Sequence, residues 1–284
     1  MWPEEEEILS IGVAAPGPLD PFTGVVLEAP NIPGWNHLPL RQELEERFDV
    51  PVVLGNDANL AALGEWRFGA GQGHSNLIYL TVSTGIGGGV ICDDHLLIGQ
   101  RGLAAELGHV TVVSDGPKCG CGQRGHLEAV AAGPAISGWV KEQLANGLES
   151  SLSEFDTITT KQVAEAARAG DRLAQAAFRR AGTFIGHAVA DFLHIFNPSI
   201  IIFGGGVSLS GDLLLDPVRE AIPERVLSEH YLDNLTIVTA QLGDDAGLMG
   251  ALALARELRP AGGEAEEKPS ALEKAVNPER FRKS

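Results

Sequence analysis

The clearest pattern along the chain is an alternation of short β-branched apolar runs with longer segments that have helical spacing of apolar residues. Alternation of this kind is typical of an α/β fold. The runs predict strands at residues 8–14, 51–54, 76–83, 199–203 and 235–239. The helical spacing predicts helices at residues 40–48, 60–68 and 161–196.

Turn and capping residues set the ends of the later helices. Ala169-Gly170-Asp171 predicts an interruption of the long Ala-rich stretch, and Asn197-Pro198 predicts its end. Asp244 and Asp245 are predicted to cap a final helix that runs to about residue 258. Residues 259–284 are polar and rich in helix breakers, and we expect a mostly disordered tail there.

Composition limits the class of protein without naming a reaction. A chain of 284 residues can hold one large or two medium domains. A formal net charge of −17 without a basic cluster argues against nucleic-acid binding. Neither an apolar run near the length of a membrane span nor a signal peptide is indicated, and the few cysteines suit a reducing compartment. We therefore expect a cytoplasmic protein with no membrane partner.

Four potential metal ligands lie close together in sequence. Cys119 and Cys121 lie in a Gly-rich turn, and His109 and His126 bracket them. Two thiolates and two imidazoles can complete a tetrahedral zinc site, so the segment predicts structural zinc. The alternative is two loop cysteines and two unrelated histidines, because the spacing is not that of a zinc finger. Cys92 lies in an apolar strand pattern and is expected in the core.

Two acidic residues accompany this segment. Glu106 and Glu128 are not needed by a tetrahedral site that already has four ligands. Both are therefore available to hold a polar substrate beside the metal. The alternative for Glu106 is a solvated helix carboxylate.

Two glycine-rich segments follow predicted strands. Thr84, Gly85 and Gly87 belong to a run in which backbone N–H groups can approach phosphates without interference from a Cβ atom. Gly204, Gly205 and Gly206 follow the strand at residues 199–203, a position where α/β proteins commonly bind nucleotides. Ordinary turns remain the alternative for both segments.

Asn56 and Asp57 follow the strand at residues 51–54. A carboxylate that projects from a strand end can act as a general base, and a neighbouring amide can orient hydroxyl groups. The alternative is that one of the two residues simply caps a helix that begins near Ala58.

Together these motifs resemble the ROK family of bacterial sugar kinases. The resemblance rests on Glu-x-Gly-His, on Cys-x-Cys-Gly-x-x-Gly-His-x-Glu, on the glycine-rich run, and on landmarks at residues 12–20, 31–35, 55–59, 203–207 and 242–247. It covers most of residues 8–257. The family usually has a third cysteine where this chain has His126, and imidazole also binds zinc well.

The resemblance implies an actin-like (ribonuclease H-like) two-lobed ATPase and sugar kinase fold. By analogy, the small lobe comprises residues 1–72 with the helix at 244–258, and the large lobe, residues 73–243, holds the sugar, zinc and ATP sites.

The implied activity is ATP-dependent phosphorylation of glucose at its 6-hydroxyl, with Mg²⁺ and a structural Zn²⁺. N-acetylmannosamine or fructose could replace glucose, and the sequence does not separate ATP from polyphosphate as the donor. Family members often form homodimers.

The resemblance assigns roles to the residues singled out above. Asp57 would be the catalytic base, and the sugar-binding residues would be Asn56, Asp57, Glu106, His109 and Glu128. Phosphates of ATP would lie at Thr84, Gly85 and Gly87, with adenosine near Gly204, Gly205 and Gly206. The metal ligands would be His109, Cys119, Cys121 and His126.

One departure from the family is severe. The family opens with a strand that carries Asp-x-Gly-Gly-Thr, a phosphate-binding turn, and the printed sequence does not contain it. The first strands of the small lobe are thus expected to be missing, either because the start codon was assigned too late, which we favour, or because the chain is a fragment. The second hypothesis is accordingly a non-catalytic sugar-binding remnant.

Overall fold

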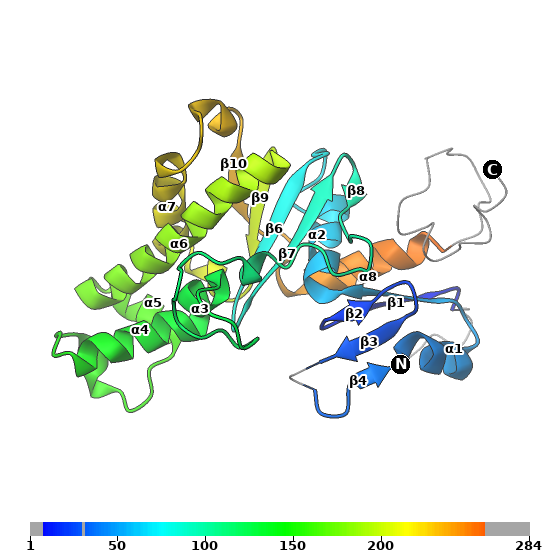
Figure 1. Ribbon diagram of the computed structural model, residues 1–284, viewed down its shortest axis with the longest axis horizontal. Helices are drawn as coiled ribbons and strands as arrows, with labels where there is room; N and C mark the ends of the chain where they lie inside the picture. The colour runs from blue at the N-terminus through cyan, green and yellow to red at the C-terminus, as the bar shows by residue number, and fades with distance from the viewer. Residues whose placement is uncertain (1–7, 30–31, 259–284) are drawn as a thin grey trace. The chain divides into compact units, whose positions relative to one another are not determined.

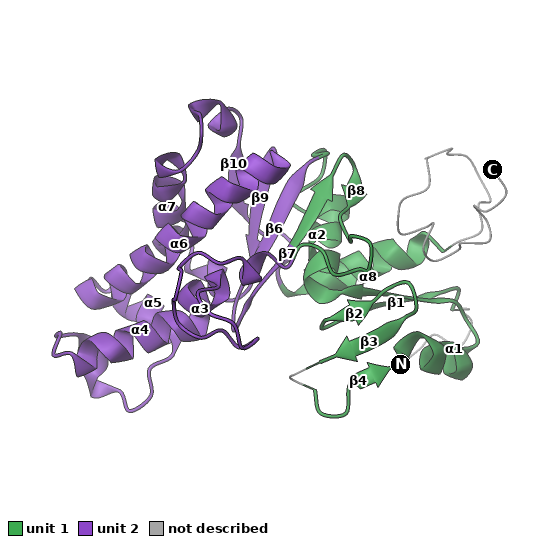
Figure 2. Ribbon diagram, viewed as in Figure 1, with its two compact units in different colours: residues 1–75, 89–105, 244–284 green, residues 76–88, 106–243 purple. Residues whose placement is uncertain are grey.

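The computed structural model describes residues 8–29 and 32–258, and the chain divides into two units (Figure 2). Unit 1 comprises Met1–Ser75, Gly89–Ala105 and Asp244–Ser284, and unit 2 comprises Asn76–Gly88 and Glu106–Gly243. The sequence assigned residues 73–243 to one lobe, whereas the structure groups Gly89–Ala105 with unit 1. The physical reason is packing, because Ile98 belongs to the hydrophobic core of unit 1. The tail at residues 259–284 lies outside the described residues.

Unit 1 contains two small sheets. Strand β1 (Ile11–Ala15) pairs in parallel with β5 (Val52–Asn56), with Ile11 opposite Val52. A three-stranded antiparallel sheet has the order β2 (Leu19–Asp20), β3 (Val25–Glu28) and β4 (Asn36–Leu38). Strand β8 (His95–Leu96) pairs antiparallel with the end of β7 (Ile86–Cys92).

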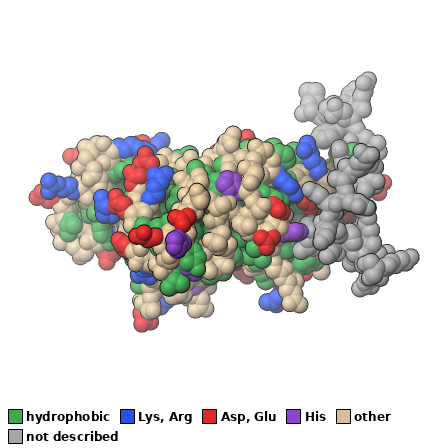
Figure 3. All heavy atoms as spheres, turned by 90° about the horizontal axis from the view of Figure 1, so that it is seen from above, with side chains coloured by type: hydrophobic (Ala, Val, Ile, Leu, Met, Phe, Trp, Pro, Cys, Tyr) green, Lys and Arg blue, Asp and Glu red, His purple; other side chains and the backbone are tan. Residues whose placement is uncertain are grey.

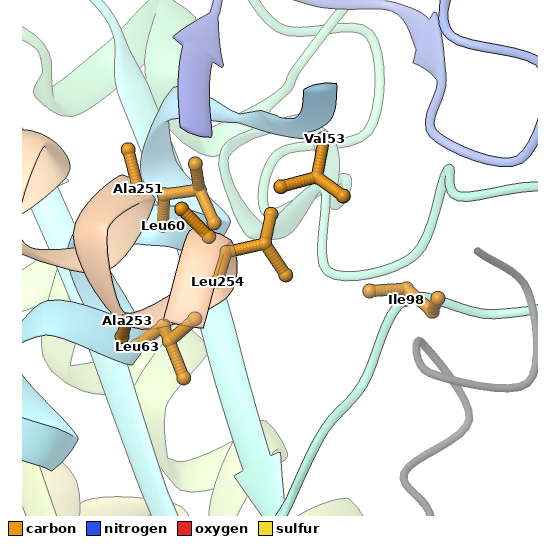
Figure 4. Close-up of a cluster of buried hydrophobic side chains, with 8 residues drawn as sticks. Val53, Leu60, Leu63, Ile98, Ala251, Ala253 and Leu254 are labelled. Carbon is orange, nitrogen blue, oxygen red and sulfur yellow. The ribbon is translucent and has the colours of Figure 1, made fainter. Parts of the chain in front are cut away.

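Three helices complete unit 1: α1 (Leu40–Phe48), α2 (Asp57–Phe68) and α8 (Ala246–Arg256). Side chains from α2 and α8 form a buried cluster with Val53 and Ile98 (Figure 4). The two helices touch through their backbones, because a Cβ atom on Gly250 would overlap the carbonyl oxygen of Leu60 and one on Gly64 would overlap that of Ala246. This close contact fixes the position of α2 against α8. Asp57 is the first residue of α2, so its position depends on the same contact.

Unit 2 is built on a parallel sheet. Strand β9 (Ile200–Gly204) lies between β10 (Thr236–Thr239) and β6 (Leu77–Val82) and pairs in parallel with both. The helices are α3 (Leu127–Ala131), α4 (Gly133–Ala145), α5 (Thr160–Arg168), α6 (Arg172–Phe196) and α7 (Asp212–Ala221). Helix α6 packs against the other four (Figure 1).

Short 3₁₀ helices connect these elements. They are η1 (Leu107–His109), η2 (Ser151–Glu154), η3 (Ser208–Ser210), η4 (Ile222–Glu224), η5 (Glu229–Leu232) and η6 (Gly243–Asp245).

The predicted break in the long helical stretch is confirmed. Helix α5 ends at Arg168. Asp171 is the N-cap of α6, and its carboxylate accepts a hydrogen bond from the N–H of Ala174. Burial alone would raise the pKa of Asp171. The hydrogen bonds from Ala174, Ser150 and Ser151 outweigh the effect of burial and lower the pKa to about 2. The prediction that Asp244 and Asp245 cap the last helix is wrong for Asp245, whose side chain makes no capping bond.

All five predicted strands are present, displaced by up to three residues at their ends. Strands β2, β3, β4, β7 and β8 and helices α3, α4 and α7 were not predicted. Among the described residues, no helix combines the length and the apolar character needed to cross a membrane. Acidic and basic side chains are interspersed on the face that Figure 3 displays.

The contact between α2 and α8 can be tested with one added methyl group. Gly250→Ala should lower the free energy of unfolding by about 1–3 kcal/mol, because the new Cβ atom must push the two helices apart. Gly138→Ala is the matched control. Gly138 lies in α4 with open space around its Cβ position, so alanine should stabilise by about 0.5–1 kcal/mol. Thermal melts that shift equally for the two variants would contradict the proposed backbone contact.

Candidate functional site

Four potential metal ligands converge in unit 2, as the sequence predicted. The ligand atoms of His109, Cys119, Cys121 and His126 all lie within 4.8 Å of one another. The two Nδ1 atoms of the histidines are 3.3 Å apart. Sγ of Cys119 is 3.7 Å from Nδ1 of His109, and Sγ of Cys121 is 3.3 Å from Nδ1 of His126.

These separations fit zinc. With Zn–N bonds of about 2.0–2.1 Å and Zn–S bonds of about 2.3 Å, tetrahedral geometry places neighbouring ligand atoms roughly 3.3–3.8 Å apart. The three distances above agree with these edges. The four residues can therefore hold zinc without rearrangement of the backbone.

A tightly folded loop brings the ligands together. The N–H groups of Val112 and Val113 both donate to the carbonyl of Gly125, and the N–H of Cys119 donates to Gln123. Gly125 has a φ of +73°, and a Cβ atom there would overlap the carbonyl oxygen of Val113. Only glycine fits this position without strain. The bend then turns the chain so that His126 returns to the cysteines.

Glu128 connects the metal loop with the glycine-rich turn. Its Oε1 accepts a hydrogen bond from the Cys119 thiol at 3.3 Å, and its Oε2 accepts one from the N–H of Ile86 at 3.1 Å. A Cβ atom on Gly85 would lie 2.5 Å from Oε2. The carboxylate thus has a structural role that the sequence did not reveal, in addition to the predicted one of holding substrate.

The thiol of Cys119 is buried, and burial raises its pKa to about 11, with a further contribution from Glu128. Metal binding therefore requires loss of this proton, as is usual for thiolate ligands.

Glu106 immediately precedes the 3₁₀ helix η1, and His109 is its last residue. His109 directs Nδ1 towards the cysteines, and its Nε2 makes no hydrogen bond with the described residues. Glu106 is exposed and is the N-cap residue of η1. The Glu106 carboxylate can accept hydrogen bonds from a polar ligand, and Nε2 of His109 can accept or donate one.

In unit 1, Asn56 and Asp57 lie where β5 ends and α2 begins. Asn56 is the N-cap of α2, and its Oδ1 accepts hydrogen bonds from the N–H groups of Ala58 and Asn59 at 3.0 and 3.2 Å. The capping alternative is therefore correct for the Asn56 oxygen, which leaves its amide nitrogen to contact other groups. Part of Asp57 is exposed to solvent, but partial burial of its carboxyl raises the pKa of that group against the opposing effect of the hydrogen bond from Ala58.

A cavity of about 740 Å³ lies within unit 2. Its walls include Thr84 and Gly206, which the sequence singled out, and also Gly133 and Thr160. Gly133 and Thr160 are the first residues of α4 and α5, and the Thr160 hydroxyl donates to the carbonyl of Gly133 at 2.7 Å. Two helix N-termini therefore border the cavity, an arrangement that favours anions such as phosphate.

The predicted glycines differ in their positions. Gly206 lines the cavity, and Gly85 lies in the turn between β6 and β7. Gly87 lies within strand β7 rather than in a loop. Gly204 ends β9, where a Cβ atom would overlap the Tyr79 hydroxyl, and Gly205 adopts a φ of +82° against the carbonyl of Val82. These last two glycines are explained by packing and backbone conformation.

Sequence reasoning missed one wall of the cavity. Lys161, Glu165 and Arg168 line it from α5. In the sequence they belong to an amphipathic helix, and their charges looked like an ordinary solvated face. Residues 146–159 return the chain so that the start of α5 lies beside Gly133, and no local pattern in the sequence signals this contact.

Comparison with known proteins agrees with these features. The family model described as the ROK family matches residues 3–258. The glucokinase of Thermotoga maritima is 41% identical over 259 residues, which cover 89% of this chain and 80% of the relative. The xylose repressor of Caldicellulosiruptor bescii is 37% identical over 87% of this chain, but the match covers 62% of the repressor.

A solved structure gives the same result. The ROK family glucokinase of Streptomyces griseus, in complex with glucose and AMPPNP, superposes with a TM-score of 0.79 at 42% identity, and the match covers 89% of this chain and 83% of that one. The fold and site define a sugar kinase of the actin-like class, as the sequence predicted. The chain belongs to the ROK family.

The metal site can be tested by metal content. Purified protein should carry about one zinc per chain, and Cys121→Ser should lose it, because serine is a poor zinc ligand. Cys92→Ser is the matched control, since Cys92 lies on β7 outside the cluster. Zinc released by a thiol-blocking reagent and measured with a colorimetric chelator gives the stoichiometry. Equal zinc in both variants would refute the assignment.

Proposed function

We propose that this protein is an ATP-dependent glucokinase that transfers the γ-phosphoryl group to the 6-hydroxyl of glucose. The observation that carries the proposal is the similarity to a ROK glucokinase whose structure contains glucose and AMPPNP, an analogue of ATP. The product, glucose 6-phosphate, would enter carbohydrate metabolism such as glycolysis.

Asp57 is the proposed general base. Its carboxylate takes the proton of the 6-hydroxyl as that oxygen attacks the γ-phosphorus, and ADP leaves with the electrons of the broken P–O bond. Burial raises the pKa of Asp57, which makes it a better proton acceptor than an ordinary aspartate. The amide nitrogen of Asn56 can donate to a neighbouring hydroxyl, because the Asn56 oxygen already caps α2.

Glu106, His109 and Glu128 are the proposed sugar-binding residues. Nε2 of His109 can bond a hydroxyl while Nδ1 faces the metal ligands. Each carboxylate oxygen of Glu128 holds one protein donor and retains a second lone pair for a sugar hydroxyl. Zinc bound by His109, Cys119, Cys121 and His126 would have a structural role, because four protein ligands leave no open position.

The triphosphate is proposed to bind in the cavity of unit 2. Backbone N–H groups of the turn at Thr84 and Gly85 and the N-termini of α4 and α5 supply positive potential. Gly206 has no side chain, so it leaves room for the nucleotide at the wall of the cavity. Magnesium accompanies the triphosphate and neutralises part of its charge.

The second candidate is a sugar-responsive regulator without kinase activity. The observation that favours it is the 37% identity to a xylose repressor. The two functions differ in turnover of ATP and agree in sugar binding. A cytoplasmic location and a homodimer stay predictions. The alternatives of N-acetylmannosamine or fructose as the sugar, and of polyphosphate as the phosphoryl donor, also stay open to test.

The proposed activity is tested by sugar-dependent release of ADP. With magnesium and zinc present, glucose should stimulate ADP release more than fructose or N-acetylmannosamine does. Sugar binding without any ADP release would instead favour the regulator.

The role of Asp57 is tested by Asp57→Asn, which should reduce kcat by about 10²–10⁴-fold with little change in the KM for sugar, because the amide cannot accept the proton. A base works only when deprotonated, so kcat/KM should fall as the pH falls through a pKa above the ordinary aspartate value of about 3.9. Asp156→Asn, in an exposed loop, is the control. Near-normal turnover by the Asp57 variant would exclude it as the base.

A further inference from the structure

A second cavity, of about 390 Å³, lies within unit 1 at the end of α2. Trp66 and Arg67 line it from the last turn of α2. The loop at residues 72–75 and Asp94, in the turn between β7 and β8, form its other walls. None of the residues that line this cavity belongs to the proposed sugar, nucleotide or metal sites. The proposed kinase reaction therefore leaves the cavity without a role.

Hydrogen bonds hold the walls of this cavity in place. Nε1 of Trp66 donates to the carbonyl of His74 at 2.8 Å, which ties the loop to α2. The N–H of His74 donates to the carbonyl of Gly71 at 3.2 Å and closes the loop on itself. The N–H of Asp94 donates to the carbonyl of Ser75 at 3.0 Å, which ties the loop to the turn between β7 and β8. The shape of the cavity is thus set by the protein's own hydrogen bonds.

Two opposite charges line the cavity without meeting each other. The Arg67 guanidinium lies over the Trp66 ring, with Cζ 3.8 Å from the ring centroid, and it donates no hydrogen bond to other residues that the structure describes. The Asp94 carboxylate likewise accepts no hydrogen bond and joins no ion pair within the described part of the chain. The ring restrains the guanidinium and leaves its N–H groups available to a ligand.

The turn beside the cavity distinguishes a zwitterion from a plain anion as the ligand. Asp93 and Asp94 are adjacent, with φ of +49° and +63°, so two carboxylates share one tight turn. A phosphate bound at Arg67 would be repelled by this turn, whereas an ammonium group would be attracted to it. Among the described residues that line the cavity, Arg67 is the one with a permanent positive charge. A ligand with one acidic and one basic group satisfies both sides.

We propose that this cavity binds a free α-amino acid, with its carboxylate on Arg67 and its ammonium group on Asp94. The planar guanidinium presents parallel N–H donors that match the two oxygens of a carboxylate. An α-amino acid carries its two charged groups on one carbon atom, so both can be bound within one small cavity. Gln72 and Ser75 line the same cavity and can bond to a polar side chain. This site does not depend on the proposed kinase activity.

The indole N–H of Trp66 lies in the cavity wall and reports binding by NMR of the full chain labelled with ¹⁵N. Trp66→Phe identifies its signal among those of the four tryptophans. L-glutamine, the probe, should shift this signal saturably and give a Kd. L-glutaminamide lacks the carboxylate and N-acetyl-L-glutamine lacks the ammonium group. Each should bind about fivefold or more weakly, because a charge-assisted hydrogen bond is lost.

Two variants assign the charges to their partners. Arg67→Ala should bind glutamine and its amide with equal Kd, because the group that distinguishes them is gone. Asp94→Asn should reduce the penalty for N-acetylation, and asparagine tolerates the positive φ at this position. Arg256→Ala is the matched control, since Arg256 also lies over an aromatic ring of unit 1, that of Phe68 at 5.8 Å, but outside the cavity. It should keep the wild-type Kd for all three ligands.

Three results would overturn the site. The first is a Trp66 signal that glutamine does not move. The second is an equal Kd of the wild-type protein for glutamine, its amide and its N-acetyl derivative, which would show that neither charge is recognised. The third is tighter binding of glucose 6-phosphate than of glutamine in the same titration, which would replace the zwitterion by an anion.

Discussion

The parallel pairing of β6 with β9 is the constraint on which the cavity of unit 2 depends. Thr81 lies opposite Gly204, so both strands end at the same edge of the sheet, as parallel strands must. The chain after β9 is tied to this edge by the hydrogen bond from the N–H of Val207 to the carbonyl of Val82. A second bond, from the N–H of Gly133 to the carbonyl of Ser83, brings the N-terminus of α4 to the same place. Three segments distant in sequence thereby enclose one cavity.

Glu128 extends this arrangement to the metal loop. One carboxylate oxygen contacts Cys119, one of the four potential metal ligands, and the other contacts the backbone that follows the turn at Gly85. Both bonds are short enough to hold the side chain in one orientation. A shift of the Cys119 loop would therefore be transmitted to the N–H of Ile86 through a single side chain. The Cys119 loop and the glycine-rich turn are consequently coupled through Glu128.

The success of the sequence predictions depended on how local the determining signal was. The metal ligands lie within one loop, and the carboxyl ends of the apolar strands are visible as short β-branched runs, so both could be predicted. The side of α5 that carries Glu165 could not, because a cavity wall and a solvated helix face have the same periodicity. Glu128 was predicted as a substrate contact, but its bond to Ile86 joins residues 42 positions apart, which no local pattern encodes.

Asn56 and Asp57 illustrate how adjacent polar residues divide two tasks. The Asn56 oxygen accepts hydrogen bonds from two of the free N–H groups at the start of α2, and the Asp57 carboxylate shares one of them, that of Ala58, at 2.8 Å. The positive end of a helix favours an ionised carboxylate, whereas burial opposes it, and the raised pKa of Asp57 shows that burial prevails. Its position follows from α2, which Gly64 and Gly250 hold in backbone contact with α8. The placement of the proposed base thus depends on the packing of its helix against α8.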